Sequence, residues 1–242
     1  MANMLEEKRP IIALDFPGQE EAAAFLRHFP EEKLFVKVGM ELFYQAGADF
    51  IRQLKDAGHS VFLDLKLHDI PNTVYRAMKV LAKLEVDMVN VHAAGGSEMM
   101  EAALQGLEEG RGAGRIRPAI IAVTQLTSTS EKQMKSEQLI DRSLNESVLH
   151  YAMLSKKAGL DGVVCSAREA GMIAKEAGEQ FLRVTPGIRS AGNAADDQTR
   201  IVAPGEAKKA GSSLIVVGRP ITRAKEPDLV YQKILREWEM GR

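Results

Sequence analysis

Eight short runs of β-branched and other apolar residues are spaced along the chain. Each run is followed by a polar or glycine-containing stretch and then by a segment of helical periodicity. This alternation is typical of βαβ units, and eight such units can close into a (β/α)8 TIM barrel, with an open doubly wound sheet as the alternative. The expected strands are IIALDF (11–16), LFVKVG (34–39), SVFLDLK (60–66), DMVNVH (87–92), PAIIAVT (118–124), GVVCS (162–166), LRVTPG (182–187) and SLIVVG (213–218).

The segments between the strands carry apolar residues at helical spacing, which predicts surface helices with one buried stripe. The chain has 242 residues, close to the roughly 250 of a typical TIM barrel. No low-complexity tract or Pro/Gly-rich linker divides it, so we expect a single barrel domain over 1–242. The polar stretch 128–144 is expected to hold a loop and a short helix on the active-site face.

Composition and charge exclude several classes of protein. The formal net charge is −1, so no global field favours a nucleic-acid polymer or an anionic membrane. No run of 18 apolar residues is present and the N-terminus is polar, which predicts a cytoplasmic protein without a membrane segment. Cys165 is the single cysteine and lies in an apolar run, so we expect a core residue and no internal disulfide.

Charged residues occur where strands are expected to end, which is unusual for buried strands. Asp15 ends the first strand, Lys37 lies late in the second, and Asp64 and Lys66 lie at the end of the third. TIM-barrel active sites are built at the C-terminal ends of the strands. These four side chains are therefore candidates for the active site.

Strand periodicity predicts where the charges of the third strand point. Asp64 and Lys66 share one side of the strand, whereas Leu63, Leu65 and Leu67 share the other. Because the leucines suit the helix-facing side, the charges are expected to face the barrel. A neutralising ion pair without a catalytic role is the alternative, but convergence with Asp15 and Lys37 favours a functional site.

The residues after the third strand continue this cluster. Asp69 follows Lys66 by three positions, in the segment HDIPNT. Pro71 is expected to end the strand, and Asn72 or Thr73 to begin the next helix.

A second cluster lies near the end of the chain, in TPGIRS (185–190) and VVGRPI (216–221). Loops after strands seven and eight of TIM barrels commonly bind phosphate. Glycines permit close backbone approach and arginines donate charge-assisted hydrogen bonds, although turn glycines and solvated arginines are the alternative. The residues concerned are Gly187, Arg189, Gly218 and Arg219.

The stretch 190–200 is rich in small and polar residues and suits a mobile loop that closes over a ligand, with Gln198 as a further donor. The five histidines, including His68 and His92, lack metal-ligand spacing, so we expect no metal site. No GxGxxG or Walker spacing is present, which argues against a dinucleotide or ATP fold.

Six motifs are distributed over nearly the whole sequence: ALDF (13–16), VKVG (36–39), DLKLHDIPNT (64–73), VTQLTS (123–128), TPGIR (185–189) and VGRPI (217–221). By these motifs, the sequence resembles the bacterial orotidine 5'-phosphate decarboxylases over nearly its whole length. The short DxKxxD pattern is shared with barrel enzymes that act on sugar phosphates, whereas the ten-residue form at 64–73 is specific.

The resemblance implies decarboxylation of orotidine 5'-monophosphate to UMP without a cofactor, in a homodimer that shares its active sites across the interface. It implies a catalytic array of Lys37, Asp64, Lys66 and Asp69, with Asp69 supplied by the neighbouring subunit. The implied substrate-binding residues are Asp15 and Lys37 at the ribose, Thr127 and Ser128 at the pyrimidine, Gln198 and Arg219 at the phosphate, Pro186, Arg189 and Gly218 in the remaining ligand shell, and Ile70 and Thr73 across the interface.

Two other functions remain open at the level of the sequence. A sugar-phosphate aldolase or decarboxylase on the same barrel would use a divalent metal to stabilise an enediolate. A non-catalytic nucleotide-binding protein would keep the phosphate site alone, although binding does not require such a charged array.

Overall fold

The computed structural model describes residues 9–189 and 202–241. Eight parallel strands form a closed barrel in chain order, because β8 pairs with β1 as well as with β7. The closed sheet confirms the predicted TIM barrel and rules out the open doubly wound sheet. The strands are β1 (Ile11–Ala13), β2 (Phe35–Gly39), β3 (Ser60–Leu67), β4 (Met88–His92), β5 (Ala119–Val123), β6 (Gly162–Val164), β7 (Leu182–Thr185) and β8 (Leu214–Val217).

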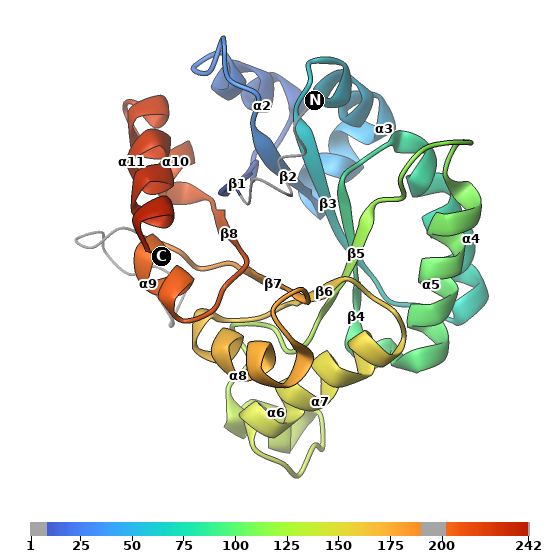
Figure 1. Cartoon of the computed structure of the whole chain (residues 1–242). Helices are drawn as coiled ribbons and strands as arrows, with labels where there is room; N and C mark the ends of the chain where they lie inside the picture. The colour runs from blue at the N-terminus through green and yellow to red at the C-terminus, as the bar shows by residue number, and fades with distance from the viewer. Residues whose placement is uncertain (1–8, 190–201, 242) are drawn as a thin grey trace.

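Helices surround the barrel on its outside (Figure 1). Short 3-10 turns at Ala82–Leu84 and Ala93–Gly95 precede β4 and follow it. The helices are α2 (Gln19–Leu26), α3 (Met40–Asp56), α4 (Pro71–Leu81), α5 (Gly96–Gly110), α6 (Glu131–Glu137), α7 (Leu144–Lys157), α8 (Ala167–Ala177), α9 (Pro204–Lys209), α10 (Arg219–Thr222) and α11 (Pro227–Met240).

All eight predicted strands are present, and several are shorter than expected. β1 ends at Ala13, so Asp15 lies two residues beyond the strand. The expected start of the helix after β3 was also wrong, because α4 begins at Pro71 and not at Asn72 or Thr73. Proline fits the first turn of a helix, where its missing N–H has no partner to lose.

The barrel separates two apolar layers. The outer layer joins the strands to the helices and includes Leu63 and Leu65, as predicted for the helix-facing side of β3. A smaller apolar layer fills the inside of the barrel. It does not include the charged side chains at the C-terminal ends of the strands. The inner layer consists of Ile11, Ala13, Phe35, Phe62, Met88, Ala119, Ile121, Val184, Leu214 and Val216.

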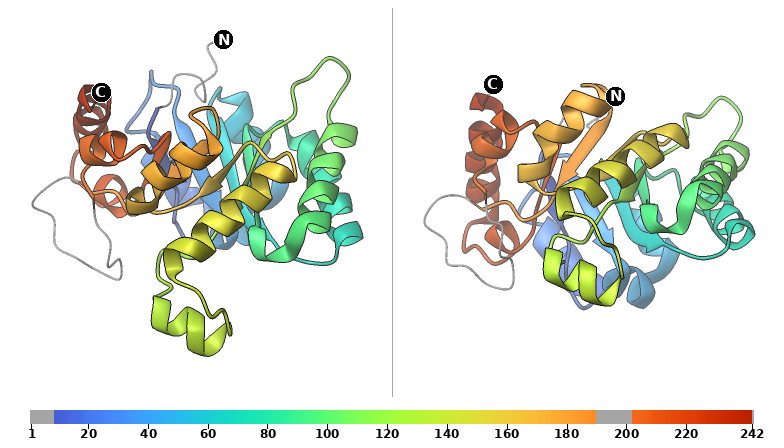
Figure 2. Two further views of the ribbon diagram at one scale, coloured as in Figure 1. Left: turned by 60° about the horizontal axis from the view of Figure 1, so that its bottom comes forward. Right: turned by 90° about the horizontal axis from the view of Figure 1, so that it is seen from below.

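The connection after β5 contains the short helix predicted within 128–144. Ser130 caps the N-terminus of α6 by accepting a hydrogen bond from the Gln133 backbone N–H, and Ser143 forms a capping box with Glu146 at the start of α7. In Figure 2 the yellow-green α6 projects away from the ring of helices.

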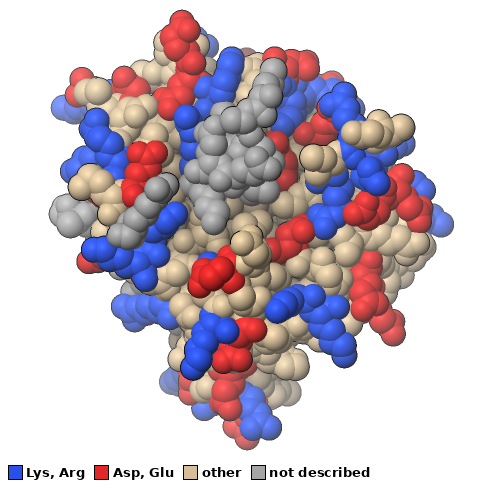
Figure 3. Space-filling model, viewed as in Figure 1, with Lys and Arg blue, Asp and Glu red and all other residues tan. Residues whose placement is uncertain are grey.

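Basic and acidic side chains are interspersed over the face of the molecule drawn in Figure 3. Among the described residues, no helix is long and apolar enough to cross a bilayer.

Candidate active site

A pocket of about 530 Å³ opens at the C-terminal ends of the strands, within the volume range of small-molecule sites. Its floor and walls include apolar side chains, among them Phe62, Val164 and Ile188. It brings together ten of the residues expected from the sequence: Asp15, Lys37, Asp64, Lys66, Thr127, Pro186, Gly187, Arg189, Gly218 and Arg219.

Four charged side chains form a continuous chain of ion pairs in this pocket. The Lys37 ammonium lies 3.2 Å from Asp15 Oδ1 and 3.2 Å from Asp64 Oδ2. Lys66 Nζ lies 2.7 Å from Asp64 Oδ1. Acid and base thus alternate from Asp15 through Lys37 and Asp64 to Lys66, with the carboxylate of Asp64 between two ammonium groups.

Burial and attraction oppose each other in the pKa values of this array. Burial favours the neutral form of Lys37, but attraction to Asp64 and Asp15 outweighs it and raises the lysine pKa. Burial likewise favours the neutral form of Asp64, but Lys37 and Lys66, with a hydrogen bond from Asn90, lower its pKa. Both groups therefore remain charged at neutral pH.

Asn90 belongs to the site and was missed by the sequence reasoning. It lies in the middle of β4 and is 1% exposed. Its Nδ2 donates to Asp64 Oδ1 at 2.6 Å, and its Oδ1 accepts from the Lys66 backbone N–H at 2.8 Å. A polar side chain inside an otherwise apolar strand was the signal that could have identified it.

The backbone of Lys66 is unusual for a strand residue. Its φ is 53°, in the left-handed region that a non-glycine residue seldom adopts. The register between β3 and β4 shifts across the same residues, between Leu63 and Leu67. The regular alternation assumed from the sequence therefore places Asp64 correctly but does not describe the backbone at Lys66.

The same pocket also contains the residues expected to bind phosphate. Arg189 is buried, and its backbone N–H donates to Val202 O at 3.1 Å. Arg219 is the first residue of α10, directly after Gly218. Gly187 has a φ of 80°, which explains why glycine is needed at this turn. Gln198 lies outside the described residues.

Four expected site residues do not line this pocket. Asp69, Ile70, Thr73 and Ser128 are exposed, and Asp69 Oδ1 accepts a hydrogen bond from the Ile70 backbone N–H at 2.6 Å. Within one chain, Asp69 therefore does not join the charged array.

Further residues that were not predicted also line the pocket, among them Gln125, Leu126 and Arg223. Gln125 is buried and donates from Nε2 to Gln138 Oε1 and to Ser147 Oγ, each at 3.1 Å. It thereby links the end of β5 to the segment after α6 and to α7.

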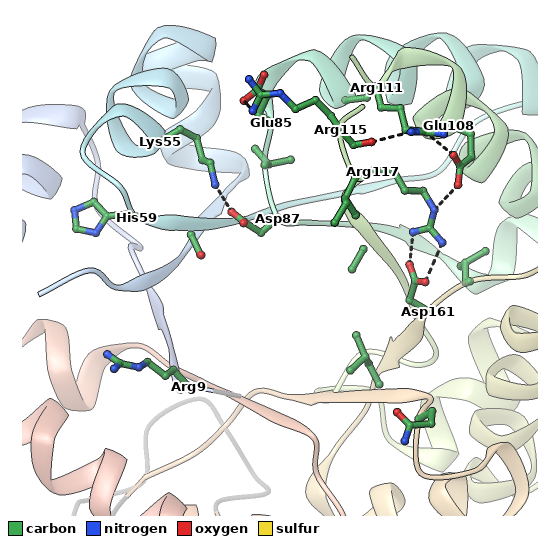
Figure 4. A pocket seen from close by; sticks show the side chains of 18 of the residues that line it. Arg9, Lys55, His59, Glu85, Asp87, Glu108, Arg111, Arg115, Arg117 and Asp161 are labelled. Carbon is green, nitrogen blue, oxygen red and sulfur yellow. Dashed lines mark hydrogen bonds and ion pairs between the residues drawn. The ribbon is translucent and has the colours of Figure 1, made fainter. Parts of the chain in front are cut away.

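A larger depression of about 2090 Å³ lies at the opposite, N-terminal end of the barrel. Figure 4 shows its charged side chains close to one another, with Lys55 against Asp87 and Arg117 against Asp161. Asp87 also accepts from the Val61 backbone N–H, and Asp161 from the Ile120 backbone N–H, both at 2.7 Å. The acidic groups satisfy strand N–H groups here, which stabilises this end of the barrel.

The chain of ion pairs from Asp15 to Lys66 does not include His68, His92 or Cys165. His68 and His92 rings lie 5.6 Å apart, and burial with nearby positive charge lowers the His92 pKa. Cys165 is fully buried, and burial raises its pKa, so the thiol stays protonated. In the described part of the chain, no three His, Cys, Asp or Glu side chains are grouped as metal ligands.

The chain is similar to known proteins over nearly its full length. A protein from Lysinibacillus sphaericus, named orotidine 5'-phosphate decarboxylase, is 64% identical over 231 residues, which cover 96% of this chain and 98% of the relative. One of the same name from Listeria monocytogenes is 62% identical over 232 residues, covering 96% and 99%.

Solved structures give the same result. A crystal structure of orotidine 5'-phosphate decarboxylase from Lactobacillus acidophilus matches with a TM-score of 0.85 at 44% identity, covering 96% of this chain and 99% of that one. An uncharacterized conserved protein from Geobacillus kaustophilus matches with a TM-score of 0.85 at 53% identity, covering 94% and 99%. The model of the "Orotidine 5'-phosphate decarboxylase / HUMPS family" matches residues 8–234, and the chain belongs to this family.

Proposed function

We propose that this chain decarboxylates orotidine 5'-monophosphate to UMP and CO2, the last step of de novo UMP synthesis, with no metal or organic cofactor. The observation that supports this most strongly is the alternating array of Asp15, Lys37, Asp64 and Lys66 in a pocket that arginines also line. The names of the relatives at 62–64% identity support the same activity.

In the proposed reaction, the bond between C6 of the pyrimidine and the carboxylate carbon breaks, and its electron pair stays on C6. The Lys66 ammonium stabilises this carbanion and transfers a proton to C6, after which solvent returns a proton to the lysine. Lys66 suits this role because it is held by Asp64 at 2.7 Å. Fixed charges in a site that excludes water stabilise developing charge without reorganisation.

The remaining residues are proposed to hold the substrate. Asp15 and Lys37 would bind the ribose hydroxyls, and Thr127 with Ser128 the pyrimidine. Arg219, with Arg189 and Gln198, would bind the phosphate. Binding energy from this unreacting group would fix the base against Lys66. Pro186 and Gly218, which line the pocket, would complete the ligand shell.

The test of the activity is the loss of pyrimidine absorbance of orotidine 5'-monophosphate with EDTA present, for the wild type and Lys66→Ala. We expect turnover by the wild type and a decrease of at least about 10³-fold in the variant, because both charge stabilisation and proton donation are lost. Activity that EDTA abolishes would favour the metal-dependent sugar-phosphate alternative. Tight UMP binding without turnover would favour a binding protein.

We also propose that two copies of the chain form a homodimer in which each supplies Asp69 to the other's site. Asp69 is exposed and outside its own pocket, while Lys66 has Asp64 as its ion-pair partner in the described part of the chain. Tyr44, in the second turn of α3, and Ile70, directly before α4, are 75% and 66% exposed, which suits an interface that also includes Thr73.

Mixing two inactive variants tests the shared site. In a heterodimer of Lys66→Ala and Asp69→Ala, one site would contain both substitutions and the other neither. Random reassociation of an equal mixture would restore about a quarter of wild-type activity. Each variant alone is the control, and a mixture no more active than its components would refute a site that uses both chains.

A cytoplasmic location is part of the same proposal, because the proposed substrate is a phosphorylated intermediate of nucleotide synthesis. Cell fractionation that recovers the activity outside the cytosol would refute it.

A further inference from the structure

Asn90 is a polar residue in the interior of β4, between apolar neighbours. Val89 and Val91 belong to the helix-facing core, whereas Met88 belongs to the layer inside the barrel. By alternation Asn90 faces the inside, where it is 1% exposed. Burying an amide is unfavourable unless its donors and acceptor have hydrogen-bond partners. The hydrogen bonds of Asn90 therefore explain why this amide is tolerated inside the barrel.

Both ends of the Asn90 amide contact the charged array. The Nδ2 group donates to Asp64 Oδ1 at 2.6 Å, and Oδ1 accepts from the Lys66 backbone N–H at 2.8 Å. A carboxylate accepts and a backbone N–H donates, so only one orientation of the amide satisfies both partners. One buried side chain thus fixes the carboxylate of Asp64 and the backbone of Lys66 relative to each other.

The hydrogen bond to Lys66 replaces a contact that the sheet cannot provide. The pairing of β3 with β4 passes from Leu63 opposite Val89 to Leu67 opposite Val91, so β3 contains extra residues at this point. Lys66 lies in this bulge with a φ of 53°. A left-handed backbone is unfavourable at a non-glycine residue and persists only where its surroundings hold it.

We infer that Asn90 is a positioning residue for the reaction, whose amide sets the separation and orientation of Asp64 and Lys66. The inference rests on the proposed function, because Lys66 must point at the reacting carbon. Asn90 acts through these two residues and not on the substrate. Bulges beside active sites often direct a side chain in this way, and Asn90 holds this one.

Two substitutions separate the two hydrogen bonds. Asn90→Leu has similar volume and removes both. Asn90→Asp keeps an acceptor for the Lys66 N–H but places a second carboxylate next to Asp64. When two carboxylates lie this close together, the pair tends to hold one proton between them. The matched control is Val91→Ala, on the same strand, which shortens a buried side chain on the helix-facing side without touching Asp64 or Lys66.

Several groups around Asp64 also titrate or carry charge, so the pH profile must be compared between variants. These are Lys37 on β2, Lys66 on β3, His92 on β4 and Asp15 beyond β1. All of them are present in the wild type and in every variant at position 90. A difference between the profiles therefore reports the substituted group.

For Asn90→Leu we expect kcat to fall about 10- to 100-fold, the usual loss when a residue that orients a catalytic group is removed. KM should change less than about threefold. The acid limb of kcat should move to higher pH, because Asp64 loses a donor that lowers its pKa. For Asn90→Asp, kcat relative to wild type should rise as the pH falls, because the introduced carboxyl group becomes a donor again when protonated.

Val91→Ala should lower the melting temperature because it leaves a cavity in the core, with kcat and its pH profile unchanged. The inference is overturned if the wild type turns over orotidine 5'-monophosphate and the kcat of Asn90→Leu is within twofold of the wild-type kcat. It is also overturned if Val91→Ala and Asn90→Leu lose kcat equally with the same pH profile. Absence of turnover in the wild type would instead refute the proposed function.

Discussion

Replacing Asp64 with asparagine removes the negative charge between Lys37 and Lys66 while keeping nearly the same shape. Asp64 is 8% exposed, and its oxygens lie 3.2 Å from Lys37 Nζ and 2.7 Å from Lys66 Nζ. At an effective dielectric constant near 20, unit charges at these separations attract by about 5 and about 6 kcal/mol. The desolvation of the buried ions, several kcal/mol each, offsets much of this attraction.

The net effect on stability is smaller than these gross terms. Removing one member of a buried ion pair costs about 3–5 kcal/mol because the other member is left uncompensated. Lys37 keeps Asp15 at 3.2 Å, but the Asp15 side chain is 60% exposed and its contribution is screened. We therefore expect Asp64→Asn to lower the free energy of unfolding by about 3 kcal/mol at pH 7.

This loss should shrink as the pH rises. A lysine can escape an unfavourable site by releasing its proton, which costs about 4.6 kcal/mol at pH 7 and about 1.9 kcal/mol at pH 9. In the wild type the pKa of Asp64 is lowered, so its contribution is complete above the ordinary carboxyl pKa and is lost only in acid. The pKa of Lys37 is raised, so its contribution is lost only as the pH rises through that higher value.

The assay is urea unfolding followed by circular dichroism at pH 7 and pH 9, at a fixed protein concentration. We expect a difference between wild type and Asp64→Asn of about 3 kcal/mol at pH 7 and below about 2 kcal/mol at pH 9. Asp15→Asn is the matched control and should cost less than about 1 kcal/mol. A variant as stable as the wild type, or an equal deficit at both pH values, would refute this account of the array.

Two further predictions concern the two ends of the barrel. Arg219→Ala should lower kcat/KM for orotidine 5'-monophosphate about 10- to 100-fold, because a charge-assisted hydrogen bond to the phosphate is lost. The slow reaction of orotidine, which has no phosphate, should be unchanged. Equal losses with both substrates would contradict phosphate binding by Arg219. Arg117→Leu leaves Asp161 without its bidentate partner, so urea unfolding should show a loss of about 1–3 kcal/mol with kcat unchanged. A decrease in kcat would show that this end affects the chemistry.

The sequence was sufficient to predict the barrel because its periodicity is local. Alternation along 60–67 placed Leu63 and Leu65 outside and Asp64 inside, and the structure agrees. The same reasoning brought Asp15 and Lys37 to the same end, because parallel strands end together at one face of a barrel. The specific motifs then indicated a substrate, which periodicity alone could not do.

Other features depend on contacts between strands, which no local pattern encodes. The left-handed backbone of Lys66 follows from the register shift between β3 and β4. Asn90 can hold this backbone only because the shift leaves the Lys66 N–H available to donate to the Asn90 side chain. The position of Asp69 outside its own pocket is likewise decided by the turn into α4. The spacing of DxKxxD says nothing about which chain that carboxylate serves.

The two ends of the barrel use charge in different ways, and the difference explains why the smaller pocket is the candidate active site. At the N-terminal end each carboxylate of Asp87 and Asp161 pairs with one neighbouring cation and also accepts a strand N–H, which anchors the strand entrances. At the C-terminal end two ammonium groups converge on Asp64. Lys66 lies at the end of this array, where Asp64 holds its ammonium group in place. In the proposed reaction, a fixed ammonium group at this position becomes favourable when the substrate develops negative charge beside it.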